Sequence, residues 1–206
     1  MTTISIIGSG NMATAIGTRA IRHGHTVEIL SRDSAKAQAL AERIGDGATV
    51  GTYGHAPAGD IVIVAVPYSN VVAAVKNYGE PLAGRILVDI SNTFNADASS
   101  LATAPGSSAT KEIAAVAPEG TQVVKALNTI FGHVLTRGTS LDAFLAGDNA
   151  DAKERVAEFL TSMNLRPRDT GGLRMASVLE SAGLLLMGLA QNGAGFDLAL
   201  GAADVL

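Results

Sequence analysis

The segment from residue 4 to residue 30 constrains the fold of this chain more than any other. An apolar run at 4–7 leads directly into the small-residue turn GSGNMA at 8–13. Small and apolar side chains then recur at helical spacing over 11–22, and a second apolar run follows at 26–30. A strand, a glycine turn, a helix and a second strand in this order are typical of the first half of a dinucleotide-binding βαβ unit.

The small residues of the turn have separate physical roles. Gly8 permits the tight turn, Gly10 lets the backbone approach a pyrophosphate, and Ala13 lets the helix pack closely on the strand. The first turn of the helix presents free N–H groups and a positive dipole end to an anion. The alternative is a βαβ unit with a tight turn and no ligand. We predict that the pyrophosphate is bound by Gly8, Ser9, Gly10, Asn11, Met12 and Ala13.

The end of the second strand distinguishes between the two nicotinamide dinucleotides. NAD-binding folds place a carboxylate there for the ribose hydroxyls, whereas this chain has Ser31 and Arg32, with Lys36 one helical turn later. A hydroxyl and two cations can hold a 2′-phosphate through charge-assisted hydrogen bonds. Glu28 lies two residues too early and is interpreted as structural, and Asp33 is expected to cap the following helix. The sequence therefore predicts NADP(H) as the cofactor.

Composition excludes several other classes of protein. The chain has 206 residues, of which 47% are hydrophobic and 17% charged, and its net charge is −4. This charge gives no basic surface for nucleic acid. The absence of cysteine excludes disulfides, thiol nucleophiles and cysteine-ligated metals. We expect no signal peptide, since the chain enters the first strand directly, and the apolar stretch at 182–190 is expected to be too short to span a bilayer. We expect a cytoplasmic protein with no metal site and no nucleic-acid or membrane partner.

Apolar runs alternate with helical patterns along the first two thirds of the chain. The runs are continuous rather than alternating, which indicates strands buried on both faces of a parallel sheet. The expected fold class is α/β, a doubly wound Rossmann sheet. The predicted strands are 4–7, 26–30, 61–66, 86–90 and 122–126, and the predicted helices are 11–22, 34–44, 69–76 and 109–116.

The last third has a different pattern and predicts a small C-terminal extension of mixed strand and helix. Its nearly uncharged helix is too apolar to face water on all sides, so it is expected in a core, a subunit interface or a cofactor site. We predict a homodimer for this reason. The division expected is a Rossmann domain at 1–140 and a small domain at 141–206. The predicted elements are a strand at 142–145, a helix at 149–163, an edge strand at 165–168, a helix at 173–189 and a short helix at 196–200.

Short motifs along nearly the whole chain are similar to those of one known family. The chain resembles the NADPH-dependent F420 reductases and, more widely, the oxidoreductase domain of STEAP-type metalloreductases. The order and spacing of the motifs carry this resemblance. They are GSGNMA at 8–13, SRDSAK at 31–36, VAVPY at 64–68, VDISN at 88–92, VKALNTI at 124–130, FLAGDNADAKERV at 144–156, and RPRDTGGL followed by LES within 166–181.

The resemblance implies an activity and a set of site residues. In that family two cofactors meet in a cleft and a hydride passes directly from one ring to the other. By position, Ala65, Val66, Pro67 and Tyr68 would flank the ribose and nicotinamide, and Asn92 would lie along the cofactor. The residues implied beside the nicotinamide and the hydride acceptor, which we treat as the catalytic positions, are Asn128, Thr129 and Ile130.

Three positions depart from the family pattern on the side of the acceptor. The family usually has His, Arg and Thr where this chain has Asn128, Ser177 and Gly183, whereas Ser181 is kept. The lost Arg would pair with an anionic tail, and Arg174 is the candidate substitute. The second substrate therefore stays open between F420, a flavin such as FMN, and a quinone-like molecule.

Two other functions remain compatible with the sequence. The chain could be a non-catalytic NADP(H)-binding sensor module, since no clear acid or base stands out. It could also be a small carbonyl or imine reductase completed by a dimer, with Lys125 or Asp89 as the catalytic group. His133 is a weaker candidate for proton transfer, and for want of a partner carboxylate it is expected to be solvated.

Overall fold

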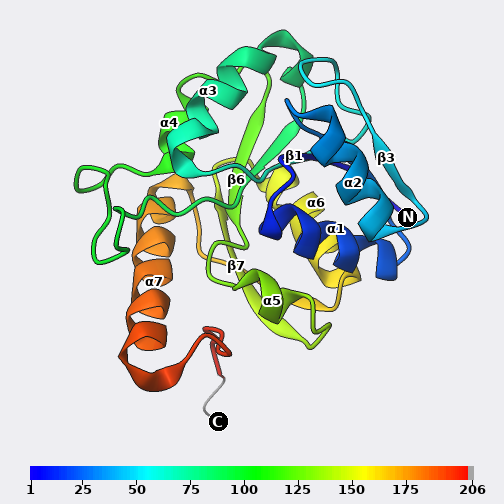
Figure 1. Cartoon of the computed structure of the whole chain (residues 1–206). Coiled ribbons are helices and arrows are strands. Elements are labelled where there is room, and N and C mark those ends of the chain that lie inside the picture. Colours follow the sequence, from blue (N-terminus) through cyan, green and yellow to red (C-terminus); the bar gives the residue numbers. More distant parts are fainter. Residues whose placement is uncertain (204–206) are drawn as a thin grey trace.

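The computed structural model describes residues 1–203 as a single mixed β-sheet with helices on both faces (Figure 1). The sheet has eight strands in the order β3-β2-β1-β4-β5-β6-β7-β8. The first six strands run parallel, as expected for the five of them that have continuous apolar runs. The fold is an α/β Rossmann-like fold with a long C-terminal helix.

The element bounds follow the sequence pattern closely in the first two thirds of the chain. The strands are β1 (Thr3–Ile7), β2 (Thr26–Leu30), β3 (Ala48–Val50), β4 (Ile61–Val64), β5 (Ile86–Asp89), β6 (Gln122–Ala126), β7 (Leu141–Gly147) and β8 (Leu165–Asp169). The α-helices are α1 (Asn11–Arg22), α2 (Ser34–Ile44), α3 (Tyr68–Tyr78), α4 (Ala109–Ala114), α5 (Gly132–Leu135), α6 (Ala150–Ser162) and α7 (Ala176–Leu189). Short helical turns are η1 (Glu80–Leu82), η2 (Leu173–Met175) and the π-type turn η3 (Ala190–Ala194).

Two parts of this arrangement differ from the prediction. The edge strand β3 has no counterpart among the predicted elements, because three partly exposed residues carry no apolar run. The short helix expected around Phe196 does not form. Gly193 and Gly195 have φ angles of 103° and 72°, which end the helix, and an irregular segment follows.

The C-terminal third continues the same sheet. Strand β7 pairs antiparallel with β6, and β8 pairs parallel with β7 at the edge, where Pro167 is tolerated. The sheet is therefore mostly parallel, as expected, with β7 as its antiparallel strand relative to β6. The proposed division into domains at 1–140 and 141–206 stays a prediction.

Helix α7 lies beside the end of the sheet and packs against α4 and β7 (Figure 1). Helical residues Leu173–Ala194 form a 22-residue stretch with a mean hydropathy of 1.4 over its most apolar window, which is 33% buried. By length and composition this stretch could cross a membrane, so the apolar segment is longer than predicted. Its outer face exposes Val178, Leu185 and Leu189. The homodimer inferred from this apolar helix stays a prediction.

Candidate cofactor and acceptor site

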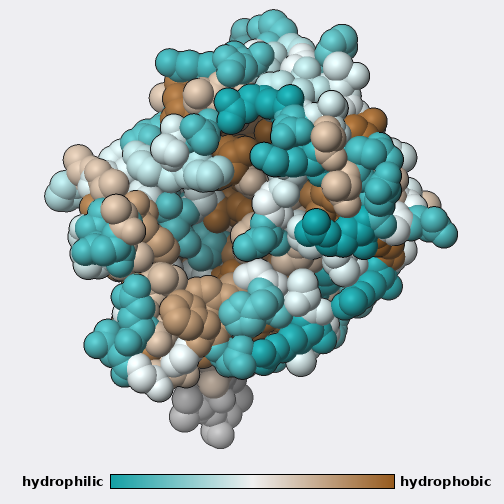
Figure 2. Space-filling view, viewed as in Figure 1, coloured by the Kyte–Doolittle hydropathy of each residue, from teal (hydrophilic) through white to brown (hydrophobic). Residues whose placement is uncertain are grey.

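Two depressions follow the carboxyl ends of the parallel strands and come together at the N-terminus of α1. The first, here the phosphate pocket, has a volume of about 460 Å³ and is lined by Gly8–Gly10, Ser31, Arg32, Lys36 and Ala65–Pro67, among others. The second, here the ring cavity, has a volume of about 840 Å³ and extends from Asn11 and Met12 to α7. Figure 2 shows this face hollowed at its centre, with apolar side chains inside the hollow. Ligands of open α/β sheets bind in this position.

The glycine turn has the geometry that the sequence predicts for a phosphate-binding loop. Gly8 has a φ of 131°, and a Cβ on it would lie 2.2 Å from the carbonyl oxygen of Ala65, so only glycine fits. Gly10 is the N-cap of α1 and has no side chain to accept a hydrogen bond from the helix. A Cβ built on Gly10 would have no atom within 4 Å, so the space in front of the turn is open. The first N–H groups of α1 therefore remain available for a pyrophosphate.

The residues that follow β2 lie together at the far end of the phosphate pocket. The Ser31 and Ser9 hydroxyls are 3.3 Å apart, and Arg32 and Lys36 line the pocket beside them. Asp33 caps α2 by accepting from the Lys36 backbone N–H at 3.1 Å, and it lies 3.4 Å from the Lys36 ammonium. The negative charge of Asp33 is therefore balanced by Lys36 and by the N-terminus of α2. The exposed guanidinium of Arg32 and the hydroxyl of Ser31 fit a 2′-phosphate.

Several predicted positions lie outside both depressions. Ala13 is fully buried and acts through packing of α1, and Thr129 is buried with a hydroxyl that has no hydrogen-bond partner among residues 1–203. The Tyr68 hydroxyl donates to Glu112 at 3.1 Å instead of facing the cofactor path. Ser177 and Ser181 line a separate depression of about 270 Å³ next to residues 103–107.

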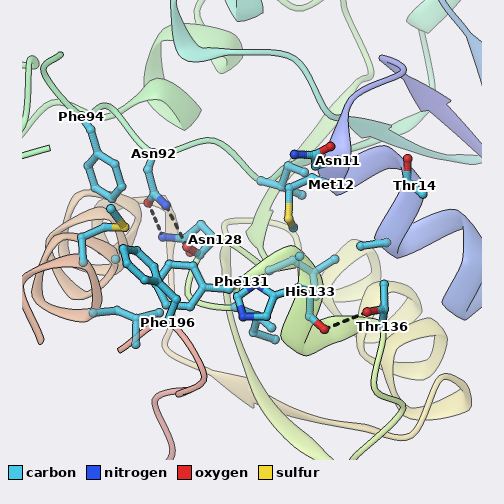
Figure 3. Close-up of a pocket in the computed structure, with 18 of the residues that line it drawn as sticks. Asn11, Met12, Thr14, Asn92, Phe94, Asn128, Phe131, His133, Thr136 and Phe196 are labelled. Carbon is cyan, nitrogen blue, oxygen red and sulfur yellow. Dashed lines mark hydrogen bonds between the residues drawn. The ribbon is translucent and has the colours of Figure 1, made fainter. Parts of the chain in front are cut away.

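The ring cavity gathers aromatic side chains from distant parts of the chain (Figure 3). Phe94 comes from the loop after β5, Phe131 from the start of α5, and Phe196 from the C-terminal segment. The rings of Phe131 and Phe196 are 5.5 Å apart at 60°. Sequence reasoning missed these residues, because no local pattern relates positions so far apart in the chain.

Two asparagine side chains form the main polar contact in this cavity. Asn128 Nδ2 donates to Asn92 Oδ1 at 2.9 Å, and Asn92 Nδ2 donates to the Asn128 carbonyl oxygen at 2.8 Å (Figure 3). Both residues line the ring cavity, as do Ile130 and Gly183. The predicted positions 92, 128 and 130 are therefore brought together at the ring end of the site.

His133 has a partner that the sequence did not reveal. Its Nε2 lies 3.0 Å from Asp197 Oδ1, and Arg137 donates to the same oxygen at 2.6 Å. The hydrogen bond and charge of Arg137, together with His133, hold the pKa of Asp197 below its usual range. The expectation that His133 lacks a partner carboxylate is therefore wrong, because the C-terminal segment folds back over α5.

Lys125 and Asp89 do not reach either depression. Both side chains are fully buried, and the Lys125 ammonium lies 2.9 Å from Asp89 and 2.9 Å from Glu180. A group that is enclosed in this way cannot contact a substrate in the cavity. The structure therefore gives no support to the carbonyl or imine reductase mechanism that uses these two residues.

This buried triad connects the sheet to α7. Burial raises the pKa of Glu180 above its usual range despite the charge of Lys125. For Asp89, burial also acts to raise the pKa, but Lys125 and the hydrogen bonds from Ser91 outweigh it and lower the value. Ala109 N–H donates to Glu180 at 3.0 Å, so the same contact includes the start of α4. The triad thus holds α7 in place as a wall of the ring cavity.

Comparison with known proteins agrees with this geometry. A family model described as "NADP oxidoreductase coenzyme F420-dependent" matches residues 3–93. An F420-dependent NADP reductase of Methanothermobacter marburgensis is 27% identical over 201 residues, covering 88% of this chain and 89% of that protein. The metalloreductase STEAP3 of Rattus norvegicus is 28% identical over 187 residues, which are 89% of this chain. The chain spans 37% of the length of that metalloreductase.

A solved structure has the same fold over the full chain. It is a putative F420-dependent NADP reductase from Arthrobacter sp., with a TM-score of 0.85 and 23% sequence identity. The match covers 99% of this chain and 100% of the other. The likeness therefore includes β7, β8 and α7 as well as the dinucleotide-binding half.

Proposed function

We propose that this chain, which is similar to F420-dependent NADP oxidoreductases, transfers a hydride between NADP(H) and a planar ring acceptor of the deazaflavin or flavin type. F420 and FMN are the two acceptors that we propose to test. The family assignment supports an NADP-dependent oxidoreductase, and the choice of acceptor rests on the cavity.

The observation that carries the proposal is that neighbouring residues at the start of α1 line the two depressions. The phosphate pocket ends at Gly10, and the ring cavity begins at Asn11 and Met12 in the first turn of α1. A dinucleotide whose pyrophosphate rests on this turn would have its 2′-phosphate near Arg32 and its nicotinamide in the ring cavity. The volume of about 840 Å³ is within the range of cavities that enclose a cofactor-sized ligand.

The residues of this chain bind, orient and exclude water. The nicotinamide ring, when bound, supplies or accepts the hydride at its own carbon. Ala65–Pro67 would border the ribose, and the apolar side chains of Ile130, Phe131 and Met187 would keep water from the facing rings. Holding two rings in contact in a dry cleft supplies the main catalytic advantage for a hydride transfer.

Proton transfer places little demand on this site. A reduced flavin-type ring can remain anionic or take a proton from water, so no buried acid is required. His133 is half exposed at the cavity and could exchange protons with solvent.

The test is anaerobic oxidation of NADPH by the purified protein, with F420 and FMN offered in separate reactions. Steady turnover with either acceptor supports the proposal and identifies the acceptor. Tight NADPH binding without turnover on F420 or FMN would contradict it and favour the sensor function. A matched reaction with NADH should be much slower if Arg32 recognises the 2′-phosphate.

A further inference from the structure

The backbone conformation of α7 does not require glycine at position 183. It lies inside α7 with no positive φ, so its backbone could carry any side chain. Glycine in the interior of a helix lowers the stability of the fold relative to alanine. The reason for it is spatial: a Cβ at this position would lie 2.6 Å from Asn92 Oδ1 and 3.0 Å from Asn92 Cγ. The side chain of Asn92 therefore occupies the space that a residue at 183 would fill.

The hydrogen bonds fix the orientation of both amides. Asn92 Nδ2 donates to a backbone carbonyl, that of Asn128, and Asn128 Nδ2 donates to the backbone carbonyl of Leu179 at 2.8 Å. A carbonyl oxygen only accepts, so each of these positions must hold a nitrogen. The second proton of Asn128 Nδ2 goes to Asn92 Oδ1. Exchanging oxygen and nitrogen in either side chain would break these bonds.

This arrangement leaves one buried acceptor without a partner. Asn128 is 5% exposed, and its Oδ1 receives no hydrogen bond from any residue in 1–203. A buried polar atom in that condition is costly unless a ligand or water satisfies it. Asn128 lines the ring cavity (Figure 3), so a ring that packs against this side chain and displaces its cover can supply the missing donor.

We propose that the Asn92–Asn128 pair, seated on Gly183, is a preorganised hydrogen-bond acceptor for an N–H group of the planar ring bound in the cavity. The inference rests on the proposed function. Asn128 Oδ1 accepts the hydrogen bond, whereas Asn92 and Gly183 are positioning residues that hold Asn128 in place. The N–H group belongs either to the carboxamide of the nicotinamide or to the imide of a flavin-type ring.

The first experiment removes the N–H group from the ligand and measures binding by titration calorimetry. One arm compares NADP⁺ with its 3-acetylpyridine analogue, in which a methyl ketone replaces the carboxamide. The other arm compares riboflavin with 3-methylriboflavin, both bound in the presence of NADP⁺. We expect one analogue to bind about tenfold more weakly, the scale of one buried hydrogen bond, and the affected arm identifies the ring. Equal binding within both pairs would overturn the proposal.

The second experiment compares two glycines of α7. Gly183→Ala forces Asn92 to move, whereas Gly188→Ala adds a methyl group where no atom lies within 4 Å. We expect Gly183→Ala to abolish the tenfold preference for the parent ligand and Gly188→Ala to preserve it. A folded Gly183→Ala protein that still binds the parent ligand tenfold more tightly than its analogue would show that Gly183 does not position Asn92.

A double substitution separates orientation from folding. Asn92→Ala in the Gly183→Ala background removes the collision together with both hydrogen bonds that Asn92 makes to Asn128, so we expect the ligand preference to stay lost. Recovery of the preference would show that Asn92 is not needed to orient Asn128 and would contradict the proposal. All these measurements are of binding, so an absence of hydride transfer would refute the proposed function without deciding this inference.

Discussion

The phosphate pocket and the ring cavity use charge in opposite ways. In the phosphate pocket the side chains of Arg32 and Lys36 are exposed to solvent and line the pocket. Behind the ring cavity, Lys125 is fully buried between two carboxylates and serves the fold. The ring cavity itself is lined mainly by neutral amides and apolar side chains, with Arg43 and His133 as the exceptions. The difference teaches that a charge left in solvent costs little and can serve binding, whereas a buried charge must first be neutralised by its neighbours.

The same substitution at the two lysines gives the largest expected contrast. Lys125→Met leaves Asp89 and Glu180 buried without a cation, so we expect the free energy of unfolding to fall by about 3–5 kcal/mol. Lys36→Met removes one exposed ion pair and should change stability by less than about 1 kcal/mol. Urea unfolding followed by circular dichroism measures both. Equal stability losses would mean that the buried triad does not hold α7.

Arg32→Ala tests the ligand side of the comparison. We expect NADPH binding to weaken by about 1.5–3 kcal/mol, the scale of a hydrogen bond to a charged group. Binding of NADH should stay nearly unchanged, since it has no 2′-phosphate. Fluorescence titration with both cofactors checks this expectation, and Arg155→Ala, at an exposed ion pair away from both depressions, is the control. An equal loss for both cofactors would place Arg32 elsewhere on the dinucleotide.

The buried triad also predicts a pH dependence of stability. The folded-state pKa of Glu180 is raised, so its contribution is fully present below the ordinary value of about 4.3 and is lost as pH rises through the folded pKa. Asp89, with a lowered pKa, contributes above about 3.9 and loses its contribution as pH falls.

Glu180→Gln tests whether ionisation of Glu180 causes the loss of stability at higher pH. The expected effect is smaller than that of Lys125→Met. The amide keeps the shape of the side chain but has no proton to lose. As pH rises above the ordinary value of about 4.3, the variant should lose less stability than the wild type. Chemical unfolding at a series of pH values measures the slopes, and parallel slopes for the two proteins would contradict the assignment.

The phosphate pocket could be predicted from the sequence because its parts are local. The turn at 8–13, the strand at 26–30 and the cap at Asp33 follow one another along the chain. Backbone geometry then requires glycine at position 8 and places Arg32 at the same edge of the sheet. Short-range rules of propensity, periodicity and capping are sufficient for such a unit.

The ring cavity could not be predicted in the same way. Phe94, Phe131 and Phe196 meet only after the C-terminal segment folds back, and the same folding supplies Asp197 to His133. Lys125 has the local pattern of a strand-end lysine, and its burial follows only when Glu180, 55 residues away, is placed beside it.

The sequence by itself determined the Rossmann fold of the first two thirds of the chain and predicted the NADP(H) end of the site, because these depend on contiguous patterns. The tertiary structure decided the antiparallel β7, the burial of Lys125 and Asp89, and the seat of Asn92 on Gly183. Those features depend on contacts between residues remote in the chain. Their formation is governed by packing and by the need to pair buried polar groups, which no local pattern records.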